Sequence, residues 1–232
     1  MKKSTIIKVS LAVGILTTGV GIQSHAATFA SDGSIQINKE AQDLKSYYSQ
    51  PGFEYYNVSG YTTNKKLEVI TPQSVLLTIT LDGNDIKKYQ DEEKQYKGLD
   101  VFVVQEGTDK SAEIKSIGGI TETNQKVYRD YVKRPNIVVN QKNSDFISSS
   151  NINDFSINKE EVSLKELDFK LRKKLIDNYG LYENGLNDGK IVIKLGDDDK
   201  DKMTIELNKK LQQHRMSDTV DVRKIQQITI NL

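Results

Sequence analysis

The stretch "VSLKELDFKLRKKLIDNYGLY", residues Val162 to Tyr182, predicts the main helix of this chain. Ser163 and Glu166 form a capping box, in which each side chain satisfies a free backbone N–H of the other residue. Gly180 ends the helix, because glycine adopts the left-handed conformation of a C-terminal cap without steric cost. The apolar residues at helical spacing between these ends are Leu164, Leu167, Leu171, Leu175 and Tyr179.

The same stretch is dense in charge, which allows two interpretations. The lysines Lys165, Lys170, Lys173 and Lys174 fall largely outside the apolar stripe. They form either a binding surface or the outer side of a supporting helix. We interpret them as a solvated face, because lysine stems can cover the flanks of an apolar stripe while the ammonium groups stay in water.

Three strand-like runs follow this helix. They are "GKIVIKL" (189–195), "DKMTIELN" (201–208) and "IQQITINL" (225–232). A helix packed on a mixed sheet of such strands is an α+β arrangement. The acidic run Asp197 to Asp199 between the first two strands indicates a hairpin tip rather than a metal site, since "GDDDKDK" lacks the glycine and distal glutamate of a calcium loop.

The first half of the chain has a different pattern. Residues 35–45 predict a short amphipathic helix. Residues 53–131 then carry short β-branched runs, such as 75–81 and 99–104, which predict a small all-β unit. Residues 136–154 are rich in Asn and Ser and predict a boundary loop between two units.

The N-terminus carries a separate signal. Lysines precede an apolar run, and Ser24-His25-Ala26 offers small residues for cleavage, so residues 1–26 are interpreted as a secretory signal peptide. The competing interpretation, a membrane anchor, lacks a positive stop-transfer cluster. Removing Lys2, Lys3 and Lys8 with this segment takes the net charge from +1 to −2. We therefore expect a secreted protein that neither inserts into membranes nor binds nucleic acid.

The composition argues against catalysis. The chain has no cysteine, and His214 is the only histidine that remains after signal removal. A Ser-His-Asp arrangement thus has one possible base, and a zinc site built on several histidines is excluded. Paired carboxylates leave glycoside hydrolysis open as an alternative. We expect a protein that is not an enzyme and has no cofactor or metal.

Two motifs resemble the signatures of the bacterial superantigen toxin family. The second family signature is similar to the set Lys159, Val162, Leu167, Asp168, Arg172, Leu175, Leu181 and Tyr182. The first is matched in part by "IGGIT", with Gly118, Gly119 and Thr121, although Ile117 replaces a tyrosine and Lys126 an asparagine. The C-terminal half looks most like the staphylococcal superantigen-like proteins.

This resemblance implies an architecture and a class of function. The fold would be an OB-type β-barrel followed by a β-grasp domain, with a long central helix. The N-terminal helix and OB-fold domain would span 27–135 and the β-grasp domain 136–232. Members of the family are secreted immune-evasion proteins that bind host immune proteins, leukocyte receptors or sialylated glycans. The signature residues would then be structural.

The resemblance also implies a glycan site on the β-grasp domain. Four residues match positions of the family members that bind sialyl-lactosamine structures: Thr204, Glu206, Lys209 and Arg215. Thr204 and Glu206 share one face of their strand, as alternation requires. The chain departs from these members at Met203 and Ile205, where aromatic residues are common, and at Ser217 and Val222, where glycine is usual.

Two further functions stay open. One is a glycan-independent ligand of a neutrophil chemoattractant receptor, acting through 136–153 or through "SQPGFEYYNVSG" (49–60) with Tyr55 and Tyr56. The other is true superantigen activity, which cross-links MHC class II and the T-cell receptor. Sialidase treatment of neutrophils separates glycan-dependent from protein-directed binding.

Overall fold

The computed structural model describes residues 29–92, 94–107, 113–142, 146–198 and 200–232. Residues 37–232 form one compact unit. The predicted signal peptide, residues 1–26, lies outside the described residues. None of the helices described is long and apolar enough to cross a membrane.

The first half of the compact unit is built on a six-stranded sheet with the order β5-β3-β2-β1-β4-β6. Its β3–β5 pair is parallel and the other pairs are antiparallel. The predicted runs 75–81 and 99–104 are confirmed as β3 and the end of β4. The strands are β1 (Gly52–Thr63), β2 (Lys66–Ile70), β3 (Leu76–Thr80), β4 (Gln95–Val104), β5 (Glu113–Ile117) and β6 (Ile120–Glu122).

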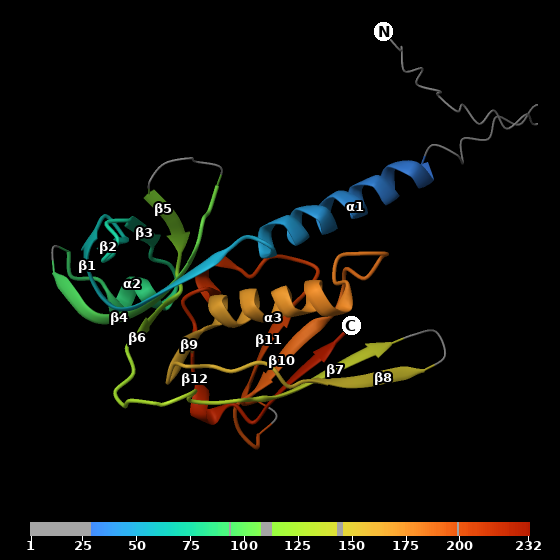
Figure 1. The fold of residues 1–232 in the computed structure, drawn as a ribbon. Coiled ribbons are helices and arrows are strands. Elements are labelled where there is room, and N and C mark those ends of the chain that lie inside the picture. Colours follow the sequence, from blue (N-terminus) through green and yellow to red (C-terminus); the bar gives the residue numbers. More distant parts are fainter. Residues whose placement is uncertain (1–28, 93, 108–112, 143–145, 199) are drawn as a thin grey trace, which may run out of the picture. The chain divides into compact units, whose positions relative to one another are not determined.

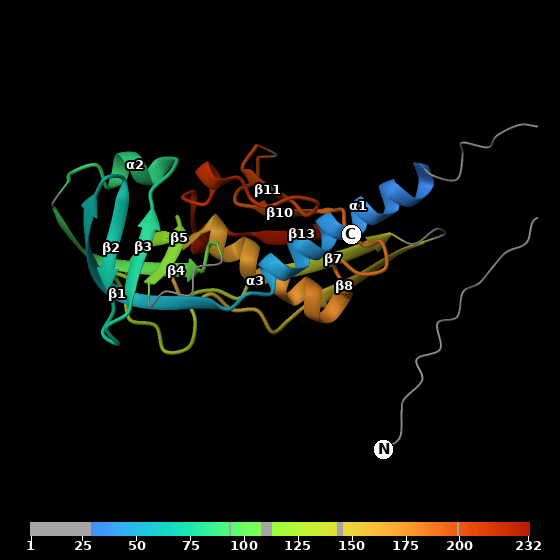
Figure 2. The same ribbon diagram turned by 90° about the horizontal axis from the view of Figure 1, so that it is seen from above.

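The second half is a five-stranded mixed sheet with the order β11-β10-β13-β7-β8, covered on one face by helix α3 (Leu164–Tyr179) (Figure 1). Strands β1 to β3 lie apart from this layer (Figure 2). All three strands predicted after the helix are confirmed. The strands are β7 (Asn136–Lys142), β8 (Ile147–Ile152), β10 (Lys190–Lys194), β11 (Lys202–Glu206) and β13 (Gln227–Asn231).

The short elements complete the unit. Strands β9 (Glu161–Ser163) and β12 (Thr219–Asp221) form a separate antiparallel pair. The short helices are α2 (Asn84–Lys88) and the 3₁₀ turns η1 (Gln213–Arg215) and η2 (Val222–Lys224).

The N-terminal helix is longer than the predicted 35–45: α1 spans Phe29–Tyr48. Within the compact unit its last turns bury Leu44, Tyr47 and Tyr48 in the core shared with α3. Tyr48 and Phe169 lie with their ring centroids 4.8 Å apart. Aromatic packing of this kind buries large side chains, which explains why the helix continues past Lys45 to Tyr48.

The expected boundary loop at 136–154 is wrong for most of its length. Residues 136–142 form β7, which pairs in parallel with β13, and residues 147–152 form the edge strand β8. Five of the six residues of β8 are exposed. An edge strand with exposed side chains can keep a polar Ser/Asn composition, which is also typical of loops.

The ends of α3 confirm half of the predicted capping box. The Ser163 hydroxyl accepts a hydrogen bond from the Glu166 backbone N–H at 3.1 Å, and Gly180 ends the helix at φ 68°. The Glu166 carboxylate has other partners: it accepts from the ammonium groups of Lys159 at 2.7 Å and Lys170 at 2.6 Å. Glu166 thus stabilises an internal ion-pair network.

The expected solvated face of α3 is also wrong in part. Lys173 is exposed, but Lys165 is completely buried. The Lys165 ammonium donates to the Ser116 hydroxyl at 2.8 Å and to the Ile117 carbonyl at 2.7 Å, and it lies 3.5 Å from the Glu106 carboxylate. Helical spacing does not reveal this burial, because the covering residues come from a segment about 50 positions earlier.

Burial of Lys165 predicts a pH dependence of stability. Burial lowers the pKa of Lys165 to about 8, despite the opposing effect of Glu106. Between this pKa and the unfolded value near 10.5 the unfolded chain binds more protons, so folding becomes more favourable as the pH rises. We expect the free energy of unfolding of the protein, relative to Lys165→Met, to rise by up to about 3 kcal/mol from pH 7 to pH 10.

Urea denaturation at both pH values measures this difference, in which the titrations shared by the two proteins cancel. Lys173→Met is the matched control, because its ammonium is half exposed and pairs with Asp177 on the surface. Its difference from the parent protein gives the effect of removing a surface ammonium from the same helix at each pH. A difference for Lys165→Met that does not change with pH would show that the buried ammonium does not titrate in this range.

Candidate functional site

Strand β11, an edge strand of the five-stranded sheet, carries the first two predicted site residues. Ile205 is buried against α3, so the alternation of the strand places Thr204 and Glu206 on the opposite, outer face. Thr204 lies opposite Val192 of β10, and Glu206 lies opposite Lys190. The predicted shared face of Thr204 and Glu206 agrees with this arrangement.

The other two predicted residues follow β11. The Lys209 ammonium forms an ion pair with the Glu206 carboxylate, so these two side chains meet on the surface. Arg215 ends the turn η1, where its guanidinium contacts the Gln212 side-chain oxygen at 3.4 Å and lies 3.8 Å from the Asp218 carboxylate. Within the described residues, no hydrogen bond joins Arg215 to Thr204 or Glu206.

The buried guanidinium of Arg172 holds the backbone of this segment. Arg172 is fully buried on α3 and donates to the carbonyl oxygens of Glu206 at 2.8 Å, Leu207 at 2.8 Å and Lys209 at 3.0 Å. Its Nε donates to the Asp168 carboxylate at 2.5 Å. Burial opposes the charge of Arg172, but the facing carboxylate more than offsets it, so the pKa of Arg172 is raised.

Two tyrosines complete this anchor. The Tyr182 hydroxyl accepts from Arg172 and donates to the Leu207 carbonyl at 2.7 Å. The Tyr48 hydroxyl donates to Asp168 at 2.7 Å and accepts from the Leu211 backbone N–H at 3.1 Å. The signature residues Asp168, Arg172 and Tyr182 thus form one buried hydrogen-bonded group, and Arg172 binds the main chain on which Glu206 and Lys209 stand.

The departures at Ser217 and Val222 do not require unusual backbone angles. Neither residue is among the non-glycine residues with positive φ in the part of the chain that the structure describes. The buried Ser217 hydroxyl accepts from the Asn84 backbone N–H at 3.0 Å and donates to the His214 carbonyl at 3.0 Å. Ser217 thus ties the turn after Arg215 to helix α2.

The signature residues Gly118, Gly119, Thr121 and Lys159 also lie at buried positions. Thr121 is buried, and its hydroxyl donates to the Asp100 carbonyl at 3.3 Å. Gly118 and Gly119 both have positive φ, and a Cβ on Gly119 would lie 2.3 Å from the Phe102 carbonyl oxygen. Lys159 is buried with Glu166 as its partner. These positions keep the strands and α3 in contact.

The predicted hairpin tip is confirmed between β10 and β11, which pair in antiparallel register. Asp197 and Asp198 are exposed there, and Asp199 lies outside the described residues. No group of three or more His, Cys, Asp or Glu side chains is arranged as a metal site in the described ranges.

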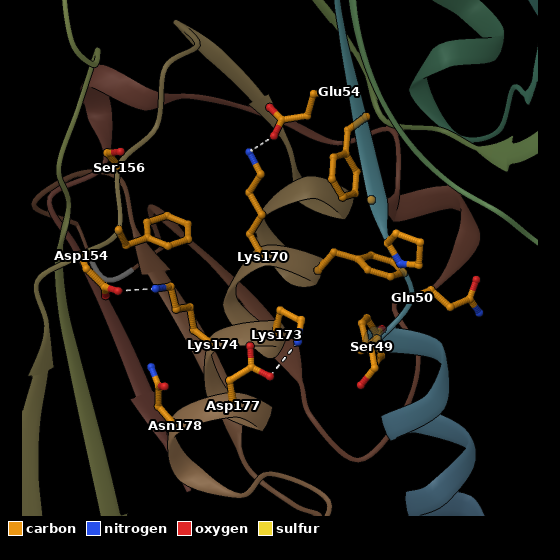
Figure 3. A pocket seen from close by; sticks show the side chains of 16 residues that line it. Ser49, Gln50, Glu54, Asp154, Ser156, Lys170, Lys173, Lys174, Asp177 and Asn178 are labelled. Atoms are coloured by element: carbon orange, nitrogen blue, oxygen red, sulfur yellow. Dashed lines mark hydrogen bonds and ion pairs between the residues drawn. The ribbon is translucent and has the colours of Figure 1, made fainter. Parts of the chain in front are cut away.

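A cleft of about 690 Å³ lies where the end of α1 and the start of β1 meet α3 (Figure 3). Three ion pairs line it: Glu54–Lys170 at 2.9 Å, Lys173–Asp177 at 2.7 Å, and Asp154–Lys174. Burial disfavours the ionised form of Glu54, but the Lys170 ammonium more than offsets this and holds the pKa of that carboxyl below its usual value.

This cleft contains none of the four residues predicted for the glycan site. It does include Ser49 to Gly52 and Glu54, which belong to the stretch 49–60 named for a protein-directed function. Of the two tyrosines in that stretch, Tyr55 is half-buried, whereas Tyr56 is exposed and its hydroxyl donates to Glu54 at 2.6 Å. The sequence did not reveal the cleft, because its walls come from segments about 100 residues apart.

Comparison with known protein families matches both halves of the chain. Residues 42–124 match the staphylococcal superantigen-like OB-fold domain, and residues 121–232 match the β-grasp domain of staphylococcal and streptococcal toxins. The α+β fold with an OB-fold domain and a β-grasp domain is thereby confirmed.

Full-length relatives come from Staphylococcus aureus. Superantigen-like protein 11 of strain Newman is 44% identical over 233 residues, with 100% of both chains covered. Staphylococcal superantigen-like 5 of the same strain is 39% identical over 238 residues, again with 100% of both chains covered.

Two similar crystal structures contain sialylated glycans. The staphylococcal superantigen-like protein SSL5 complexed with sialyl Lewis X is 38% identical, with a TM-score of 0.74 over 83% of this chain and 99% of that chain. A superantigen-like protein from Staphylococcus aureus in complex with 3-N-acetylneuraminyl-N-acetyllactosamine is 39% identical, with a TM-score of 0.72 over 83% of this chain and 97% of that chain.

Proposed function

This chain belongs to the staphylococcal superantigen-like proteins, and we propose that it is a secreted immune-evasion protein that binds sialylated glycans on host leukocyte or serum glycoproteins. In this proposal residues 1–26 are removed on export, residues 27–135 form the N-terminal helix and OB-fold domain, and residues 136–232 carry the glycan site. The protein acts by binding and not by catalysis, without a cofactor and without cross-linking MHC class II to the T-cell receptor.

The observation that carries the proposal is the anchored β11 segment. Thr204, Glu206, Lys209 and Arg215 match the family positions for sialyl-lactosamine binding, and two relatives have been crystallised with such glycans. Arg172 fixes the backbone beneath Glu206 and Lys209, so these side chains start from a defined geometry. A rigid segment loses less conformational entropy on binding than a mobile loop.

The charges of the segment fit a sialylated ligand. Arg215 is about a quarter exposed and lies 3.8 Å from Asp218, which is too long for a strong hydrogen bond. Its guanidinium is therefore available to a sialic acid carboxylate, with which it can form charge-assisted hydrogen bonds. Thr204 and Glu206 offer a hydroxyl and a carboxylate to sugar hydroxyl groups.

Binding to human neutrophils tests this proposal. We expect sialidase treatment of the cells, and separately Arg215→Ala, to lower the affinity of the mature protein at least about tenfold, the loss typical of a charge-assisted hydrogen-bonded pair. Arg223→Ala is the matched control, because Arg223 is exposed and pairs with Asp221 outside the site. Full binding to sialidase-treated cells, with Arg215→Ala also unaffected, would reject the glycan proposal.

A second function is supported by the cleft of Figure 3. A glycan-independent ligand of a neutrophil chemoattractant receptor would need a recessed surface for a peptide segment, and the cleft beside 49–54 offers one with exposed ion pairs that can exchange partners. Binding that survives sialidase treatment and is lost in a Lys173→Ala/Lys174→Ala variant would favour this alternative.

A further inference from the structure

A second cleft, of about 590 Å³, opens on the outer face of the five-stranded sheet. The strand register brings five polar residues from five strands into one row across this face. From β11 to β8 the row is Glu206, Lys190, Asn231, Asn140 and Ser149. All of these except Ser149 line the cleft, which we call the amide cleft.

The amides of this row are oriented by hydrogen bonds. The Ser149 hydroxyl donates to the Asn140 side-chain oxygen at 2.7 Å, and the Asn140 amide donates to the Asn231 side-chain oxygen at 3.1 Å. Asn187 and Asn208 add two more amides to the walls. Amide groups carry donors and acceptors together, which suits ligands rich in hydroxyl groups.

The charge of the amide cleft is balanced. Lys142 and Lys190 face it together with Asp188 and Glu206, so their formal charges cancel. An anionic ligand gains no net attraction there, in contrast to the partly exposed guanidinium of Arg215. Ile147, which is 66% exposed, adds an apolar wall. A cleft with amides, balanced charges and an apolar wall fits the hydroxyl groups and C–H faces of neutral sugars.

Glu206 connects the amide cleft to the proposed glycan site, because it belongs to both. We propose that the amide cleft is a second saccharide subsite, which binds the neutral sugars that follow the sialylated end of a longer glycan. This subsite rests on the proposed function. It makes the protein selective for extended glycans over short sialylated caps.

Titration calorimetry with two glycans tests this subsite. The short probe is 3-N-acetylneuraminyl-N-acetyllactosamine, and the long probe is the same glycan extended at its reducing end by a second N-acetyllactosamine. We expect the mature protein to bind the long probe about three- to tenfold more tightly, as one or two net hydrogen bonds predict. Asn140→Ala and Asn231→Ala should remove this gain and leave the affinity for the short probe within about twofold.

Matched variants keep the test decisive. Asn136→Ala is the control, since Asn136 is exposed on β7 but lies outside the amide cleft, and it should keep the gain. Asn187→Ala, in the turn before β10, tests the cleft without disturbing the row of polar residues on the sheet. This variant should lose the gain in affinity for the long probe. Equal affinities for both probes, or a gain that survives in Asn187→Ala and Asn231→Ala, would overturn the subsite alone. Failure of both probes to bind would overturn the proposed function and the subsite together.

Discussion

Arg172→Met is expected to lower the free energy of unfolding by about 3–5 kcal/mol, the cost of leaving a buried charge without its partner. The substitution leaves the buried Asp168 carboxylate without its cationic partner and removes the hydrogen bonds from the guanidinium to the Glu206, Leu207 and Lys209 carbonyl groups. Urea denaturation followed by circular dichroism measures the loss.

Two further variants identify the cause of this loss of stability. Lys173→Met removes an exposed ion pair one position further along α3 and should cost less than about 1 kcal/mol. Asp168→Asn/Arg172→Met removes both charges and should recover part of the loss, because no unpaired charge remains. A loss for Arg172→Met no larger than that for Lys173→Met would show that the ion pair is not essential to the fold.

Gly119→Ala is expected to be nearly as damaging, at roughly 3 kcal/mol or more. The new Cβ would lie 2.3 Å from the Phe102 carbonyl oxygen, at a residue with φ +85°. The oxygen cannot simply retreat, because the Phe102 backbone N–H donates to the Gly119 carbonyl at 2.9 Å and the residues are buried where β4 meets β6. Thermal unfolding measures the cost.

Gly98→Ala separates the steric clash from the backbone strain. Gly98 has a similar φ of +67°, but a Cβ there would meet no atom within 4 Å. It should therefore show only the strain of a left-handed residue, about 1–2 kcal/mol. If both alanine variants were destabilised equally, close packing would not be the reason for glycine at position 119.

Local signals in the sequence predicted much of the fold. Ser163 and Gly180 mark the ends of α3 because caps depend only on the adjacent turn of the backbone. Alternation likewise predicted β10, β11 and β13. The OB-fold and β-grasp domains followed from the signatures, not from periodicity.

The predictions failed where contacts with segments distant in the sequence determine the structure. Lys165 is charged and lies outside the apolar stripe, yet Ser116 and Ile117 from β5 cover it and bind its ammonium. The polar composition of β8 resembles a loop, but its backbone pairs with β7. Neither a buried cation nor an edge strand has a signature in its own residues.

The candidate site was likewise predicted only where local signals determine it. Alternation along β11 was enough to place Thr204 and Glu206 on one face. The support from Arg172 and the row from Glu206 to Asn140 could not be predicted, because both depend on strand register and on a helix that lies about 35 residues away along the chain.

The anchor beneath the site acts on main-chain atoms alone. Arg172 binds the carbonyl oxygens of residues 206, 207 and 209, and every amino acid supplies a carbonyl oxygen. Side chains at positions 206, 208 and 209 can therefore be exchanged during evolution while Arg172 of α3 still binds the same backbone carbonyl groups. Such a division lets one backbone frame display many different side-chain surfaces, so that the recognition surface can change while the fold stays the same.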